Sequence, residues 1–105
     1  MSEPDDPILD LQREYLAELP GMLLGMRGEI DRFRRGDQAV SASLTAHFHR
    51  LAGSGGSYGF PGISAVARET ERWLRTGPSP AEAPRLDAAV TRLEEMVEKA
   101  AEDLE

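Results

Sequence analysis

The spacing of apolar residues constrains the fold of this chain more than any other feature. Apolar side chains recur at intervals of three, four or seven residues, and no segment shows the alternation typical of a β-strand. This spacing places side chains on one face of an α-helix. In the first such segment the apolar positions are Leu9, Leu16, Leu19, Leu23, Met26, Ile30 and Phe33. The pattern therefore predicts an all-α fold.

Capping residues mark the ends of the first predicted helix. Asp6 followed by Pro7 predicts a helix that begins near Ile8, and Gly36 predicts its end. The apolar phase continues across Pro20, which is compatible either with one kinked helix or with two nearly collinear helices.

Three further helices follow after short connections. Asp37 is placed to cap the second helix, Pro61 to begin the third, and Ser79 with Glu82 to form a capping box for the last. Their predicted buried positions are Val40, Leu44, Phe48, Leu51, Gly55 and Tyr58, then Ile63, Val66, Ala67, Thr70 and Leu74, then Leu86, Val90, Leu93, Val97, Ala100 and Leu104. We expect an up-and-down antiparallel four-helix bundle with an additional N-terminal helical segment.

The composition describes one small domain over residues 1–105. The chain has 105 residues, no cysteine and a formal net charge of −7, so it has no disulfide and no thiolate nucleophile, which fits a reducing cytoplasm. The acidic residues 1–6 are predicted to be disordered and lack a signal-peptide pattern, and no stretch is apolar enough to cross a bilayer. The initiating methionine and the capped ends lead us to expect a whole cytoplasmic gene product without a membrane partner.

Nucleic acid is not the expected partner of so acidic a chain. Phosphate contacts require clustered basic residues, and the one tight cluster is formed by Arg32, Arg34 and Arg35. These arginines close the first predicted helix, where cations favour the helix dipole.

The second predicted helix contains a run of small residues that are unfavourable in a helix. Each glycine in a helix interior costs about 0.5–1 kcal/mol relative to alanine, and three occur close together, at Gly53, Gly55 and Gly56. The run is not a P-loop, because no lysine follows the glycines, and Tyr58 occupies the third glycine position of a dinucleotide fingerprint. A flexible loop is the remaining simple interpretation, but apolar residues keep helical phase through the run.

Two histidines precede these glycines. On a helix His47 and His49 point about 200° apart, so they cannot share a metal ion, and the chain has no other histidine. His47 is expected to be a surface or partly packed residue. Gly53 and Gly56 lie along the same face as His49, with Ala52 beside them. These positions predict a flat platform on which another protein can dock.

The segment His49-Arg50-Leu51-Ala52-Gly53-Ser54, followed by Gly59, resembles the H-x-L-K-G-S…G signature of histidine-containing phosphotransfer (HPt) domains. The resemblance covers the motif helix, the Phe60-Pro61-Gly62 turn and the next helix, and the predicted bundle extends it to essentially the whole chain. It implies that His49 accepts a phosphoryl group at Nε2 from a phosphoaspartate receiver domain or a histidine kinase in a two-component phosphorelay. It further implies a monomer with no kinase activity and no cofactor of its own, Mg²⁺ being held by the receiver.

The resemblance also assigns residues around His49. Alignment through Gly59 and Ile63 places the family's glutamine or glutamate at Glu71, which would accept the Nδ1–H of His49. The family's lysine is replaced by Ala52, and Arg50 or Arg68 is expected to supply the missing positive charge.

Two alternative functions remain open from the sequence. Ala52 favours an adaptor or antagonist that keeps the receiver-docking face without transferring phosphate. A bundle that binds a metal ion or small molecule across a dimer, through His49 and its symmetry mate, is the other.

Overall fold

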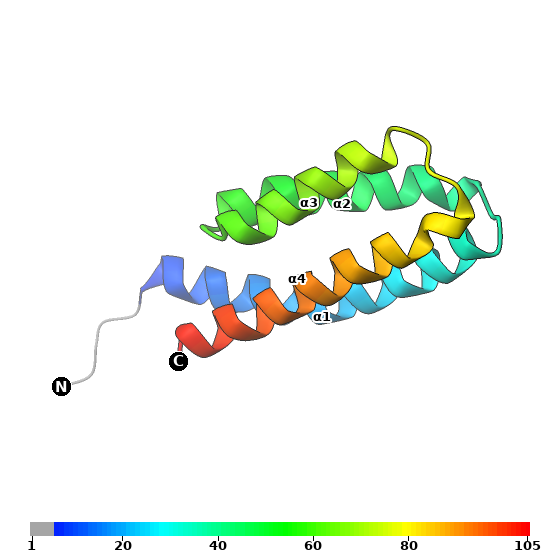
Figure 1. Cartoon of the computed structure of the whole chain (residues 1–105). Coiled ribbons are helices and arrows are strands. Elements are labelled where there is room, and N and C mark those ends of the chain that lie inside the picture. Colours follow the sequence, from blue (N-terminus) through cyan, green and yellow to red (C-terminus); the bar gives the residue numbers. More distant parts are fainter. Residues whose placement is uncertain (1–5) are drawn as a thin grey trace.

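The computed structural model describes residues 6–105 and is all-helical over that range. Its elements are α1 (Pro7–Arg34), α2 (Ala39–Ser57), α3 (Pro61–Leu74), the short 3₁₀ helix η1 (Pro80–Glu82) and α4 (Ala83–Asp103). Figure 1 shows α2 and α3 side by side in one layer and α1 and α4 side by side in the other, and these two pairs make the most extensive contacts. The predicted all-α, four-helix fold is therefore confirmed.

The additional N-terminal segment expected from the sequence is not a separate element. Residues 7–20 form the first half of α1, and Pro20 lies inside this single helix on its exposed side. The carboxylate of Asp6 caps α1 by accepting hydrogen bonds from the amides of Ile8 at 2.9 Å and Leu9 at 3.3 Å. The disorder predicted for residues 1–6 falls outside the described residues except at Asp6, which is ordered as this cap.

The connections between helices use the expected turn residues. Gly36 and Gly59 have φ of +92° and +88° after α1 and α2, a backbone conformation that favours glycine. Asp37 accepts a hydrogen bond from the amide of Ala39 at 3.1 Å, although the capping position of α2 is Gln38. The capping box of Ser79 and Glu82 is present, and it opens η1 rather than α4.

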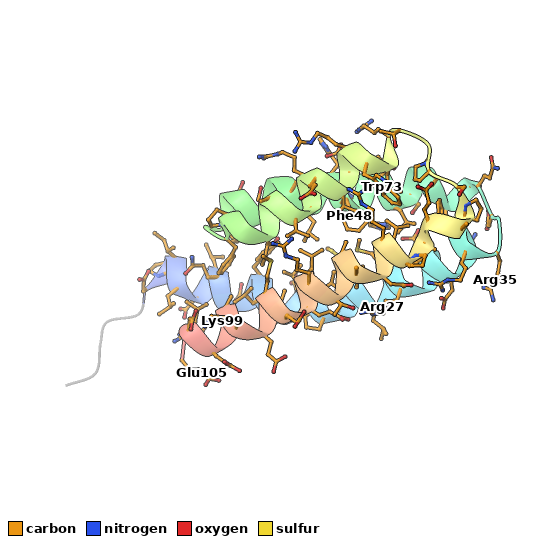
Figure 2. All side chains as sticks on the ribbon, in the orientation of Figure 1. Arg27, Arg35, Phe48, Trp73, Lys99 and Glu105 are labelled. Atoms are coloured by element: carbon orange, nitrogen blue, oxygen red, sulfur yellow. The ribbon has the colours of Figure 1, made fainter. Side chains whose placement is uncertain are left out.

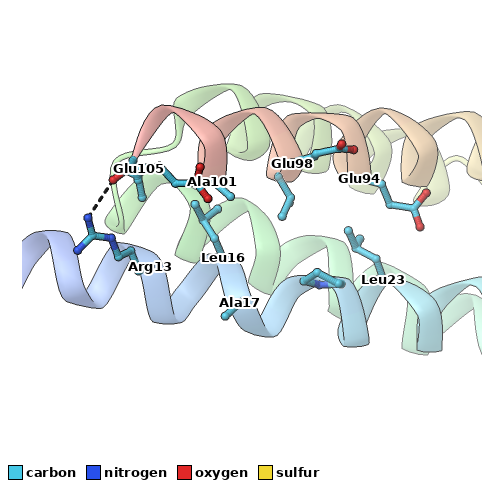
Figure 3. Close-up of a pocket in the computed structure, with 11 residues that line it drawn as sticks. Arg13, Leu16, Ala17, Leu23, Glu94, Glu98, Ala101 and Glu105 are labelled. Atoms are coloured by element: carbon cyan, nitrogen blue, oxygen red, sulfur yellow. Dashed lines mark hydrogen bonds between the residues drawn. The ribbon is translucent and has the colours of Figure 1, made fainter.

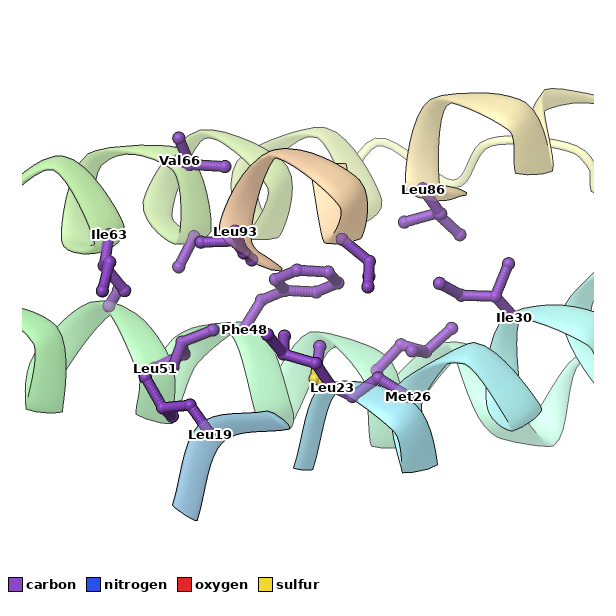
Figure 4. Close-up of a cluster of buried hydrophobic side chains, with 14 of the residues drawn as sticks. Leu19, Leu23, Met26, Ile30, Phe48, Leu51, Ile63, Val66, Leu86 and Leu93 are labelled. Atoms are coloured by element: carbon purple, nitrogen blue, oxygen red, sulfur yellow. The ribbon is translucent and has the colours of Figure 1, made fainter. Parts of the chain in front are cut away.

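The core lies between the two layers. Figure 4 shows the ring of Phe48 surrounded by aliphatic side chains that include Leu23, Leu51 and Leu93, and all four residues are at most 1% exposed. Figure 2 shows Phe48 inside the bundle and charged side chains such as Arg35 on its outside. Within residues 6–105 no helix combines the length and apolar character needed to cross a bilayer.

Several core positions differ from the sequence pattern. Ala100 and Leu104, near the end of α4, were predicted to be buried and are only half-buried. Leu9 is only half-buried, because it lies in the first turn of α1 beyond most of the core. Tyr58 is 36% exposed and follows the end of α2, where its ring stacks on that of Tyr15 with centroids 4.4 Å apart. Tyr15 itself is buried, and its hydroxyl lies 2.7 Å from that of Ser54.

Candidate functional site

Helix α2 continues without interruption through the glycine run to Ser57. This excludes the flexible-loop interpretation. At Gly55 an added Cβ would lie 3.0 Å from the backbone nitrogen of Ser64 and 3.1 Å from Cγ2 of Ile63. Gly55 therefore permits the close approach of α2 and α3. Gly53 is different, because an added Cβ there would meet no atom within 4 Å.

The side chain of His49 projects from the exposed face of α2 and is 70% exposed. Its Nδ1 lies 3.0 Å from Oε2 of Glu71 on α3, and the Glu71 side chain is 11% exposed. The tight packing at Gly55 helps to bring this carboxylate under the imidazole. One ring nitrogen is thus fixed by a neighbouring helix while the other side of the ring faces solvent.

Arg75 joins this pair from the next turn of α3. Its Nε and Nη2 donate hydrogen bonds to the same Oε2 atom of Glu71, at 3.0 and 2.6 Å. The hydrogen bond from Arg75, and to a smaller extent that from His49, holds the pKa of Glu71 below its ordinary value of 4.5 despite the cost of burial. Glu71 is therefore ionised at neutral pH.

The ionised carboxylate determines which tautomer of His49 suits this geometry. A carboxylate only accepts hydrogen bonds, so the imidazole meets it favourably when Nδ1 carries the proton. In the neutral ring Nε2 then has a free lone pair. The arrangement presents a nucleophilic nitrogen to solvent.

A shallow hollow of about 670 Å³ lies beside His49. Its lining includes the basic side chains of Arg50 and Arg75, together with small side chains of α2. Of the two arginines expected to replace the lysine, Arg50 lines the hollow, whereas Arg68 is exposed on α3 and is not among the lining residues. Arg75 was missed by the sequence analysis, although its spacing of four residues from Glu71 is typical of a helical ion pair.

The expected platform needs one correction. Gly53 and Gly56 are exposed beside His49, but Ala52 is only 5% exposed because it faces α3. Its carbonyl accepts a hydrogen bond of 2.6 Å from the hydroxyl of Ser64. Ala52 therefore offers almost no side-chain surface to a partner.

His47 occupies a different side of α2. Its Nδ1 lies 2.9 Å from Oε1 of Glu29 on α1, without the alignment of a hydrogen bond, and its side chain is 30% exposed. The other oxygen of Glu29 accepts a hydrogen bond from Ser43. Within residues 6–105 no group of three potential metal ligands occurs.

A second groove, of about 690 Å³, lies between α1 and α4. Figure 3 shows Leu16 and Leu23 from α1 facing Glu94 and Ala101 from α4 across it. No residue of the His49–Glu71–Arg75 cluster lines this groove.

Comparison with protein families found one match that spans nearly all of the chain. The family model of the Hpt domain matches residues 10–103, which includes all four α-helices except for the first residues of α1. Comparisons with curated proteins and with solved structures found no significant match.

Proposed function

The chain belongs to the Hpt domain family, whose members carry out histidine phosphotransfer in two-component signalling, and from this premise we propose that His49 is its phosphoacceptor. One observation carries the proposal. The imidazole of His49 is exposed, and its Nδ1 contacts the ionised carboxylate of Glu71, which lies on the neighbouring helix α3.

The transfer step follows from this geometry. The lone pair of Nε2 attacks the phosphorus of an aspartyl phosphate on the partner, and the P–O electron pair leaves with the aspartate carboxylate. The ring keeps its Nδ1 proton and gains positive charge, which the carboxylate of Glu71 stabilises at 3.0 Å. No proton has to leave His49 during the forward step, and the reverse step needs none to return.

Little further machinery is required of this chain. Phosphoryl transfer depends mainly on positioning and on charge stabilisation. The partner receiver domain would hold the Mg²⁺ ion, and a histidine kinase or a second receiver would supply or remove the phosphoryl group. We therefore propose a phosphoryl carrier without kinase activity of its own that acts as a cytoplasmic monomer.

The charge distribution supports docking through the α2–α3 layer. Residues 39–75 carry four arginines and two glutamates, whereas the whole chain has a net charge of −7. Opposite charge on a partner accelerates association and orients the encounter. We propose that the partner presents an acidic face, as a site that holds Mg²⁺ and a phosphorylated aspartate would.

The docking platform consists of Gly53 and Gly56 beside His49. Gly53 has no packing reason to lack a side chain, and this supports close approach by a partner backbone. The chain reversals at Gly36 and Gly59 also support the antiparallel order of helices, in which the platform lies toward the C-terminal end of α2.

Incubation with a phosphorylated receiver domain tests the acceptor role. We expect an acid-labile, base-stable label on the wild-type chain and on His47→Gln, and no label on His49→Gln. His47→Gln is a matched control because His47 lies on α2, as His49 does, and also contacts a glutamate, at 2.9 Å. Label on His49→Gln, or none on the wild type, would contradict the proposal.

The non-transferring adaptor is the second candidate, and the replacement of the family's lysine by Ala52 favours it. Tight binding of a phosphorylated receiver without transfer over minutes would select this function. Transfer over that time would exclude it.

A further inference from the structure

A phosphoryl group on His49 would bring two negative charges to the surface of α2. Such a group is stabilised by charge-assisted hydrogen bonds from a nearby cation. The position that supplies this cation in the family signature is Ala52, whose side chain is buried. If His49 carries a phosphoryl group, as its proposed function requires, another residue must supply this cation.

Arg75 is held next to His49 by the carboxylate that both residues contact. Two of its N–H groups bind Oε2 of Glu71, the oxygen that also contacts Nδ1 of His49. A guanidinium has five N–H donors, so three remain available. Its side chain is 60% exposed and lines the same hollow as His49. The imidazole and the guanidinium are therefore joined through one carboxylate and share one open space.

The other candidate cations lack this arrangement. Arg50 lines the hollow, but within residues 6–105 it makes no hydrogen bond or ion pair, so contact with a phosphoryl group would require ordering a free side chain. Arg68 does not line the hollow. Arg75 is already ordered by Glu71, so less conformational entropy is lost when it binds an anion.

We propose that Arg75 donates hydrogen bonds to the phosphoryl group on Nε2 of His49 while it remains bound to Glu71, and thereby prolongs the life of the phosphorylated protein. Hydrolysis breaks the N–P bond, returns its electron pair to Nε2 and joins the oxygen of water to phosphorus. The acid lability of phosphohistidine shows that protonation promotes this step. Hydrogen bonds to the ionised phosphoryl oxygens oppose protonation, so Arg75 slows the loss of the group.

Phosphoramidate, a small N–P donor, allows a test that needs no protein partner. The His47→Gln chain is phosphorylated with it, so that only His49 can carry phosphohistidine, and is compared with the same chain carrying Arg75→Gln, Arg75→Lys or Arg72→Gln. Arg72 is the matched control because it is an exposed arginine of α3 that does not line the hollow. The ³¹P NMR signal gives both the decay rate and the pKa of the phosphoryl group.

We expect Arg75→Gln to shorten the half-life of phosphohistidine about threefold to tenfold, and to raise the pKa of the phosphoryl group. Arg75→Lys should restore part of both values, since it keeps the charge, and Arg72→Gln should match the parent. Equal decay and equal phosphoryl pKa in Arg75→Gln and the parent would overturn the inference. Equal effects of Arg72→Gln and Arg75→Gln would also overturn it, because they would indicate a diffuse field rather than a contact.

Failure of the inference is distinguishable from failure of the proposed function. Normal transfer from a receiver together with unchanged decay in Arg75→Gln would refute the role of Arg75 alone. Absence of transfer from any receiver, with faster decay in Arg75→Gln after chemical loading, would refute the relay function and leave the Arg75 contact standing. Failure of phosphoramidate to label His49 would contradict both.

Discussion

Substitution of Gly53 by alanine should change the stability and the transfer activity of this protein in opposite directions. Gly53 lies inside α2, where alanine is favoured over glycine by about 0.5–1 kcal/mol. The added methyl group would meet no atom within 4 Å, so no packing penalty offsets the gain. For a domain of this size the gain corresponds to a rise in Tm of about 2–6 °C.

The same methyl group should impair transfer. It would stand on the platform next to His49, where we propose that a partner backbone packs closely. An extra methyl group in a closely packed contact costs about 1–3 kcal/mol, so the transfer rate from a phosphorylated receiver should fall about tenfold or more. Gly53→Ala is therefore expected to be more stable and less active than the wild type.

Two other glycines provide controls. Gly25 of α1 also has no atom within 4 Å of an added Cβ, so Gly25→Ala should give the same stability gain without loss of transfer. Gly55→Ala should instead destabilise the fold, because its Cβ would lie 3.0 Å from the backbone nitrogen of Ser64, which cannot move independently of α3.

Urea unfolding and receiver-to-protein transfer, measured on the same preparations, test this reasoning. A Gly53→Ala chain that is no more stable than the wild type would show that the α2 geometry is wrong. A stabilised chain with unchanged transfer would show that partners do not use the platform.

Substitutions at Glu71 and Phe48, and the addition of salt, should each have a measurable effect. Glu71→Ala should lower the initial transfer rate about tenfold or more, whereas Glu71→Gln, which keeps an acceptor for the Nδ1–H of His49, should stay within a few-fold of the wild type. The pKa of Glu71 is lowered in the folded state, so its ionised form contributes stability above the ordinary value of 4.5, and this contribution is lost as pH falls through the lowered pKa. The unfolding free energy of the wild type should therefore exceed that of Glu71→Gln at neutral pH, and the difference should shrink in acid; a constant difference would contradict this. Phe48→Ala should reduce the unfolding free energy by about 3–5 kcal/mol, because the ring is fully buried. The association rate with a receiver should decrease as salt is added, and an unchanged rate would argue against the basic α2–α3 face.

Much of the fold follows from local signals in the sequence. The spacing of apolar residues by three and four positions predicts the buried faces of all four helices, because a small bundle forms its core from one apolar stripe of each helix. Asp6 and Gly36 predict the ends of α1, since their roles depend only on nearby backbone groups. Local signals could not predict whether Pro20 breaks the first helix. A proline is compatible either with a continuous helix or with a broken one, and the packing of both halves of α1 decides which of them forms.

The site was partly predictable for a related reason. Helical phase places His49 beside Gly53, and the family resemblance suggests Glu71, which lies 3.0 Å away. Arg75 was overlooked because the replacement for the missing lysine was sought in arginines close to the motif rather than in the ion-pair partner of Glu71. Ala52 was placed on the exposed platform because phase alone does not show how deeply α3 covers the edge of α2.

The position of the phosphoryl group on the labelled protein tests the central claim most directly. NMR correlation of ³¹P and ¹⁵N with the ring protons identifies which imidazole nitrogen is phosphorylated. The structure predicts a phosphoryl group on Nε2 of His49, with Nδ1 still protonated and bound to Glu71. A phosphoryl group on Nδ1 of His49, or on His47 instead, would contradict it.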